Sequence, residues 1–197
     1  MQWYEAEVRA LQKELARAGR NRPPVFYGSS SIRLWTTLAE DFDPRVVNAG
    51  FGGSTLEACD YFFARVIPPL QPRSLLLYAG DNDLGDGREP EDTLDRFRSL
   101  ADKVAESLGP IPLGFVSVKA SPARYPIINR IRRLNELVRR DIESRPFVYY
   151  VDVFSEMLDL SGKPRPEHFL EDGLHLSRLG YRLWSRLLEP HRHQIFT

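Results

Sequence analysis

Asp172 and His175 lie three residues apart, directly before an amphipathic segment that we expect to form a helix over 176–188. In a serine hydrolase, an imidazole takes the proton of the serine, and a carboxylate fixes the tautomer of the imidazole and stabilises the imidazolium. Asp172 and His175 could fill these two roles. A D-x-x-H match is also common in polar loops, so a solvated histidine is the alternative, and the choice depends on the rest of the chain.

A run of serines follows the first predicted strand, with Ser30 in the middle. At a strand-to-helix turn, the N–H groups and dipole of the helix favour developing negative charge, so Ser30 could be a nucleophile. Helix capping by Ser29, Ser30 and Ser31 is the alternative. The motif is not the G-x-S-x-G elbow of the α/β-hydrolases, because Ile32 stands where its second glycine would be.

A glycine-rich segment covers 50–55 and includes Gly53. Glycines turn sharply and leave their N–H groups unhindered, so this segment could bind either an oxyanion or a phosphate. Its spacing matches neither of the common phosphate-binding motifs, and no lysine follows, which weakens the phosphate interpretation. A purely structural turn stays open as a third interpretation.

A side-chain amide stands among carboxylates in the segment 80–83. Asn82 is a neutral hydrogen-bond donor, which suits an oxyanion hole. Alternatively, Asp81, Asp83 and Asp86 could join Asn82 as oxygen ligands of Ca²⁺ or Mg²⁺, although the spacing is not that of an EF-hand. Ordinary turn chemistry is a further alternative. We expect no metal here.

Composition narrows the classes of function. The formal net charge is zero, with 27 basic and 27 acidic residues, so no bulk field attracts nucleic acid or an anionic membrane. Cys59 is the only cysteine, which excludes an intramolecular disulfide and a cysteine-based zinc site. Residues 1–20 lack the apolar core of a signal peptide, and no stretch is long enough to span a bilayer. We therefore expect a cytoplasmic protein without nucleic-acid partners or stable membrane insertion.

Strand-like and helical patterns alternate along the chain. Runs rich in β-branched, aromatic or aliphatic residues predict strands over 24–27, 45–48, 74–78, 113–118 and 147–153. Helical spacing predicts helices over 3–18, closed by Gly19, and over 31–38, 55–67, 91–108 and 127–143. Such alternation implies a flavodoxin-like, three-layer α/β/α fold with a five-stranded parallel sheet, in a single domain over 1–197. The first helix could cover the core or pair with a neighbour, which leaves a homo-oligomer open.

The polar islands occupy related places in this predicted fold. The segments around Ser30, Gly53 and Asn82 each follow a predicted strand, while the Asp172 and His175 pair precedes the last helix. In open α/β sheets, ligands bind in the crevice outside the carboxyl ends of the strands. We therefore expect these islands to converge on one site.

Together the islands resemble the conserved blocks of the SGNH (GDSL-like) hydrolases. The matching segments, in the order of the family, are Phe26 to Trp35 (FYGSSSIRLW), 48–55, 80–83 (GDND) and 172–175 (DGLH). They span 26–188, nearly the whole chain, and their conjunction is far more specific than any one of them. One departure is Ser29, which stands where the first block usually has an aspartate, and which puts local hydrogen bonding in question rather than the mechanism.

The resemblance implies roles for individual residues. Ser30 becomes the nucleophile, His175 the general base and Asp172 its orienting partner. The oxyanion hole becomes the backbone N–H groups of Ser30 and Gly53 with the side chain of Asn82. The implied reaction is hydrolysis of a small ester through an acyl-enzyme, without a cofactor.

The family resemblance leaves the substrate and two other functions open. Short acyl esters, acetylated sugars, lysophospholipids and thioesters are all within the range of the family. A non-catalytic ligand-binding protein on the same fold is one alternative function. A flavodoxin-like nucleotide-binding protein is another, which the absent phosphate motifs disfavour.

Several side chains could shape a substrate pocket at the same edge of the sheet. We hypothesise that some of Phe51, Tyr125 and Phe169 line the acyl or alcohol pocket. The segment 119–124 follows the fourth predicted strand and could shape the same cleft. Arg124 could meet an anionic leaving group, with a solvated arginine as the alternative.

Overall fold

The computed structural model describes residues 1–17 and 22–196. At its centre is a five-stranded sheet of order β2-β1-β3-β4-β5 in which every pairing is parallel. Its strands are β1 (Pro24–Gly28), β2 (Val47–Gly50), β3 (Ser74–Tyr78), β4 (Leu113–Val116) and β5 (Val148–Val151). This order is flavodoxin-like, so the predicted fold class is confirmed, and the carboxyl ends of all five strands lie along one edge.

Helices surround the sheet and connect its strands. The α-helices are α1 (Glu5–Leu15), α2 (Ser30–Arg33), α3 (Leu38–Asp41), α4 (Leu56–Val66), α5 (Asp81–Gly85), α6 (Pro90–Leu108), α7 (Ile128–Ile142), α8 (Arg178–Leu188) and α9 (Arg192–Phe196). Short 3-10 turns are η1 (Gln2–Tyr4), η2 (Pro68–Leu70), η3 (Pro122–Ile127), η4 (Ser155–Met157), η5 (Pro166–His168) and η6 (Glu189–His191).

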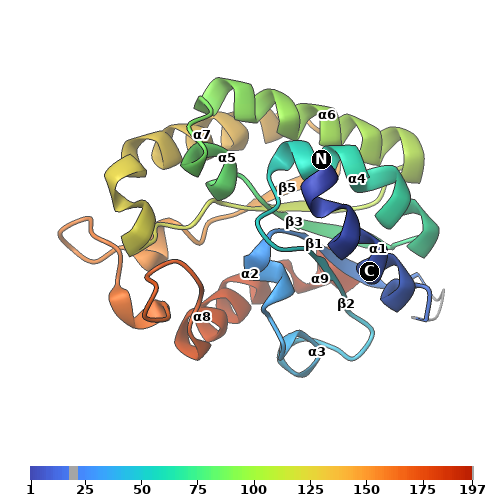
Figure 1. Cartoon of the computed structure of the whole chain (residues 1–197), viewed down its shortest axis with the longest axis horizontal. Coiled ribbons are helices and arrows are strands. Elements are labelled where there is room, and N and C mark those ends of the chain that lie inside the picture. Colours follow the sequence, from blue (N-terminus) through green and yellow to red (C-terminus); the bar gives the residue numbers. More distant parts are fainter. Residues whose placement is uncertain (18–21, 197) are drawn as a thin grey trace.

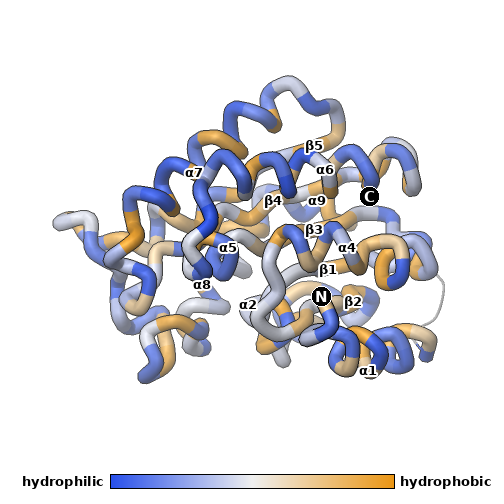
Figure 2. Tube along the Cα trace, turned by 45° about the horizontal axis from the view of Figure 1, so that its top comes forward, coloured by the Kyte–Doolittle hydropathy of each residue, from blue (hydrophilic) through white to orange (hydrophobic). Residues whose placement is uncertain are grey.

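The helices form one layer on each face of the sheet (Figure 1). One layer contains α1, α4, α6 and α7, whose buried residues share a hydrophobic cluster with one face of the strands. The other contains α2, α3, α8 and α9, whose buried residues form a second cluster against the opposite face. In Figure 2 the hydrophobic residues gather toward the interior, while α7 is largely hydrophilic.

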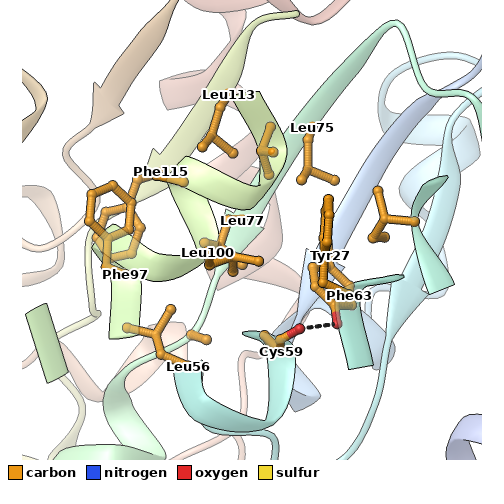
Figure 3. Close-up of a cluster of buried hydrophobic side chains, with 14 of the residues drawn as sticks. Tyr27, Leu56, Cys59, Phe63, Leu75, Leu77, Phe97, Leu100, Leu113 and Phe115 are labelled. Atoms are coloured by element: carbon orange, nitrogen blue, oxygen red, sulfur yellow. Dashed lines mark hydrogen bonds between the residues drawn. The ribbon is translucent and has the colours of Figure 1, made fainter. Parts of the chain in front are cut away.

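Strand β3 shows how one short run serves both layers. Leu75 and Leu77 belong to the first cluster, while Leu76 and Tyr78 belong to the second, because successive side chains of a strand point to opposite faces. Figure 3 shows Leu75 and Leu77 in the first cluster, where the hydroxyl of Tyr27 donates a 2.7 Å hydrogen bond to the carbonyl of Cys59. A strand buried on both faces reads as a continuous apolar run, which is why its bounds were predictable.

Several predicted elements differ from the structure in their bounds; β4 and β5, for example, each end two residues earlier than predicted. In two other regions the difference has a visible local cause. The predicted helix 31–38 is replaced by the short α2 and α3, because Asp41 accepts hydrogen bonds from the side chains of Trp35 and Thr37, both at 2.7 Å, and holds the chain in a turn between them. Strand β2 begins two residues later than predicted, because Arg45 is engaged in a local turn by Asp43.

The first helix packs on the core. The structure has η1 followed by α1 where a helix over 3–18 was predicted, and residues 18 and 19 lie outside the described residues. Val8, Leu11 and Leu15 are buried in the first cluster, so the apolar face of α1 covers the core. Self-association stays a prediction.

Within residues 1–17 and 22–196, no helix combines the length and the apolar character needed to cross a membrane. A cytoplasmic location stays a prediction.

Candidate active site

Ser30 is the first residue of α2 and follows the end of β1. Ser29 and Ser31 are buried, with exposed fractions of 0% and 1%, whereas Ser30 is partly exposed. The side chain of Ser29 does not cap α2, so the predicted capping role is not observed for it. Of the three serines, Ser30 therefore has the hydroxyl that a ligand can reach.

The loop before α8 holds an ordered carboxylate and imidazole pair. His175 Nδ1 lies 2.6 Å from Asp172 Oδ2, and Asp172 Oδ1 accepts the backbone N–H groups of Leu174 and His175 at 2.8 and 2.9 Å. The hydrogen bond with the His175 side chain and these N–H groups lower the pKa of Asp172 to about 2. An ionised carboxylate only accepts hydrogen bonds, so Nδ1 of a neutral His175 carries the proton and Nε2 is free to take another.

Hydrogen-bond donors of the predicted oxyanion hole are available. Asn82 Nδ2 donates one bond of 3.0 Å to the carbonyl of Ser54, which fixes the amide and leaves its second N–H. The backbone N–H groups of Ser30 and Gly53 have no acceptor among residues 1–17 and 22–196. Gly53 has a φ of 65°, a left-handed conformation that favours glycine.

Contact between the segment around Ser30 and the glycine-rich segment 50–55 requires a glycine. A Cβ on Gly50 would lie 2.3 Å from the backbone nitrogen of Arg33, so only glycine lets β2 end against α2. Beside it, Asn48 Nδ2 donates a 2.6 Å hydrogen bond to the carbonyl of Ile32. The glycine-rich turn is thereby held next to the helix that begins with Ser30.

Asp83 joins the glycine-rich segment 50–55 to the segment 80–83. Its Oδ2 accepts the backbone N–H of Leu56, the first residue of α4, at 2.8 Å. Asp83 has an exposed fraction of 0%, and burial raises the pKa of its carboxyl to about 6. Together with the bond from Asn82 to Ser54, this contact fixes the glycine-rich loop against α5.

The loop that contains Asp172 and His175, and the helix α8 that follows it, also contact neighbouring segments. The backbone N–H of Ala123 donates to the carbonyl of Gly173 at 3.0 Å, which ties the loop that contains Asp172 and His175 to η3. From α8, the hydroxyl of Tyr181 donates to the carbonyl of Ser31 at 3.1 Å. Within the described residues, the side chains of Ser30 and His175, the predicted nucleophile and base, make no hydrogen bond to each other. Such bonds are often long before substrate binds.

The carboxylates beside Asn82 are engaged with protein groups. Asp81 Oδ2 accepts from Lys119 Nζ at 2.7 Å and from the hydroxyl of Tyr78 at 3.2 Å. Burial opposes ionisation of Asp81, but the Lys119 ammonium outweighs it and keeps the pKa of the carboxyl below its usual value. No group of three or more potential metal ligands occurs in the described part of the chain. Sequence reasoning included Lys119 in the segment 119–124 that could shape the cleft, but it did not predict the pairing of Lys119 with Asp81.

The aromatic residues proposed for substrate contact have different surroundings. Phe51 is 0% exposed and packs edge-on against Tyr4 and Phe62 in the core. Phe169 is also buried, in the second cluster, whereas Tyr125 is 39% exposed. Burial gives no support to a lining role for Phe51 and Phe169, and of the three only Tyr125 offers an exposed ring.

Known proteins share this sequence pattern and this fold. The profile of the GDSL-like lipase/acylhydrolase family matches residues 6–183. The alpha1 subunit of platelet-activating factor acetylhydrolase IB from Bos taurus is 26% identical over 175 residues, which cover 83% of this chain and 72% of that protein. The solved structure of a protein from Streptococcus pneumonia matches this chain with a TM-score of 0.84 at 20% identity. The match covers 97% of this chain and 95% of that chain. An acetylxylan esterase from Geobacillus stearothermophilus has a TM-score of 0.72 at 14% identity, covering 88% and 95%.

Proposed function

Because the chain belongs to the GDSL-like lipase/acylhydrolase family, we propose that it is a serine esterase that cleaves small acyl esters through an acyl-enzyme. The observation that carries the proposal is the arrangement of Asp172, whose one oxygen holds the imidazole of His175 while the other holds the backbone of the same loop. This arrangement fixes the ring in the tautomer that a general base needs.

Formation of the acyl-enzyme is the first half of the proposed reaction. The Ser30 oxygen bonds to the ester carbonyl carbon while His175 Nε2 takes its proton. The electron pair of the carbonyl moves onto oxygen, where the N–H groups of Ser30, Gly53 and Asn82 stabilise the charge. When the carbonyl re-forms, the alcohol leaves with the proton from His175.

Hydrolysis of the acyl-enzyme repeats the sequence with water. His175 takes a proton from water, and the water oxygen bonds to the acyl carbon. The Ser30 oxygen then leaves and recovers the proton, which releases the acid and restores the enzyme. These steps need no cofactor.

Acetyl esters are the first substrates to test. The bovine relative is named an acetylhydrolase and the Geobacillus neighbour an acetylxylan esterase, so both names specify an acetyl group. We therefore propose acetyl and other short acyl groups, with p-nitrophenyl acetate and acetylated xylo-oligosaccharides as probes.

Substitution of the serines tests the choice of nucleophile. Ser30→Ala should abolish turnover of p-nitrophenyl acetate and labelling by a fluorophosphonate probe. Ser31→Ala is the matched control and should retain most activity, because its hydroxyl is 1% exposed. Equal activity of Ser30→Ala and the wild type would refute the proposal, and loss in Ser31→Ala alone would identify a different nucleophile.

A further inference from the structure

Arg124 lies between two parts of the proposed catalytic site. It belongs to η3, whose Ala123 donates its N–H to Gly173 in the loop of the acid and base. Contact between these segments is close, since a Cβ on Gly173 would lie 3.1 Å from Cβ of Pro122. The position of Arg124 is thereby fixed relative to this loop.

The guanidinium of Arg124 covers Gly85 at the end of α5. A Cβ on Gly85 would lie 2.4 Å from Arg124 Cζ and within 2.6 Å of both terminal nitrogens. Residues three or four apart on a helix are neighbours on its surface, so Gly85 follows Asp81 and Asn82 by one turn on the same side of α5. The cation therefore lies close to the amide proposed to stabilise the oxyanion.

Arg124 forms no salt bridge within the described residues, although its charge acts with that of Lys119 to lower the pKa of Asp81. Its Nε is buried without a hydrogen bond, and the nearby carboxylate of Asp81 is already paired with Lys119 at 2.7 Å. Three arginines on the flanking segments are paired with carboxylates: Arg88 with Glu57, Arg130 with Glu89 and Arg133 with Glu91. Arg124 differs from these three arginines because no carboxylate forms a salt bridge with its guanidinium, whose terminal nitrogens could therefore bind a ligand.

We infer that Arg124 binds an anionic group of the ester substrate, so that the preferred substrates carry a carboxylate, phosphate or sulfate near the scissile bond. The inference rests on the proposed ester hydrolysis at Ser30. A guanidinium presents a fixed fork of donors that matches the oxygens of these anions. Because the net charge of the chain is zero, this attraction is a local property of the site.

Matched pairs of esters test the inference and locate the anion. On the acyl side, p-nitrophenyl hemiglutarate is compared with p-nitrophenyl valerate. On the alcohol side, p-acetoxybenzoate is compared with its methyl ester. In one pair, kcat/KM of the anionic ester should exceed that of the neutral ester by about 10- to 100-fold, the range of a charge-assisted hydrogen bond. Added salt should reduce the preference.

Variants then assign the preference to Arg124. Arg124→Gln should bring the anionic-to-neutral ratio of kcat/KM down toward one, and Arg124→Lys should restore part of it. Gly85→Ala should also lower the ratio, because the new methyl group displaces the guanidinium without removing its charge. Arg140→Gln is the matched control and should leave the ratio unchanged, since Arg140 pairs with Glu136 on the exposed surface of α7.

A binding measurement separates this inference from the proposed function. Ser30→Ala protein should bind p-acetoxybenzoate or the hemiglutarate in a calorimetric titration, and adding Arg124→Gln should weaken that binding by about 10-fold or more. Ester hydrolysis that depends on Ser30 but is indifferent to substrate charge would overturn the anion site alone. Absence of hydrolysis would overturn the proposed function, and the titration would still decide whether Arg124 binds the anion.

Discussion

Ser29, Ser30 and Ser31 have the same side chain, but only Ser30 is partly exposed. Burial leaves the neighbouring hydroxyls inaccessible, so a single position in the run can meet a substrate. The residue-level chemistry of the site therefore depends on which donors and acceptors remain unused after folding. Asn82 has a remaining donor for the proposed oxyanion hole, and Asp172 leaves Nε2 of the proposed base His175 free.

Replacement of Asn82 tests the oxyanion hole. Asn82→Ala should lower kcat by about 10²- to 10³-fold, the usual cost of losing one oxyanion donor. Its effect on the free energy of unfolding should be about 1 kcal/mol, because one hydrogen bond to Ser54 is lost. Ester-hydrolysis kinetics and urea unfolding measure the two effects, with Asn129→Ala on the exposed surface as the control. Unchanged kcat would contradict the role of Asn82.

Asp172 gives the proposed enzyme a definite dependence on pH. Its pKa is lowered to about 2, so the favourable charged state is present above the usual pKa of a carboxyl and is lost only as the pH falls through about 2. Asp172 should therefore stay ionised throughout the range from about pH 5 to 8. An NMR titration of its side-chain carboxyl carbon measures this, and a midpoint at or above the usual carboxyl value of about 4 would contradict the ordered pair.

Asp172→Asn keeps the shape of the side chain while removing its charge. The amide can donate to Nδ1 and so favour the wrong tautomer, and kcat should fall by about 10³- to 10⁴-fold. Pre-steady-state measurement of acyl-enzyme formation would show the loss directly. A variant with kcat close to the wild type would rule out the assigned pair.

Short motifs in the sequence mark the candidate catalytic residues, whose roles stay predictions, but they do not mark the residues that support them. Ser30, Asp172 and His175 lie in short motifs, so local spacing is enough to find them. Lys119 and Glu7 contact residues that are 38 and 45 positions away in the chain, and no local pattern encodes such pairs.

At the scale of elements, Asp83 acts as a connector between α5 and the start of α4. Its carboxyl group accepts the N–H of Leu56. A side-chain amide at this position could also accept this N–H, but it would carry no charge. Burial raises the pKa of Asp83 to about 6 from a usual value of 3.8. Folding therefore favours the protonated form, and the stability gained from it is present below pH 3.8 and lost as the pH rises through about 6.

Asp83→Asn should reveal this linkage. The stability of the wild type relative to the variant should fall by up to about 3 kcal/mol between pH 4 and pH 7, since one pKa unit corresponds to about 1.4 kcal/mol. Urea unfolding of both proteins at several pH values measures the difference. A difference that does not change with pH would show that the pKa of Asp83 is not raised in the folded protein.

Element bounds were predictable where the pattern was continuous. Strand β3 begins and ends as predicted, and α6 begins only one residue earlier than predicted. The bounds of α2 and α3 were not predictable. The side chain of Asp41, which lies beyond the end of α2, accepts the hydrogen bonds that hold the turn after this helix. Phe147 has a φ of 63°, which no apolar pattern predicts, and β5 accordingly starts after it.

Across the whole molecule, η1 and α1 at the start of the chain support the glycine-rich loop 50–55. Glu7 Oε1 accepts the backbone N–H of Gly52 at 2.8 Å and Arg33 Nη1 at 3.0 Å, and the hydroxyl of Tyr4 donates to the carbonyl of Gly53 at 3.0 Å. A helix at the start of the chain thereby contacts the loop that follows β2. Since both hydrophobic clusters share one sheet, we propose that the chain acts as a single domain.

Glu7→Ala should loosen this support. We expect kcat to fall by about 10-fold or more with a smaller change in KM, because catalytic donors must be held accurately. Glu14→Ala, on the exposed surface of α1, is the control and should retain the kcat of the wild type. Equal kcat in the two variants would show that α1 does not influence the loop.

Burial of Cys59 makes the native chain suitable for selective labelling. The single thiol is 0% exposed, and burial raises its pKa, so it reacts slowly with maleimides. A cysteine introduced at the fully exposed Leu160 would be the only fast-reacting group. A fluorophore or spin label there could report substrate binding spectroscopically, without prior removal of any natural cysteine.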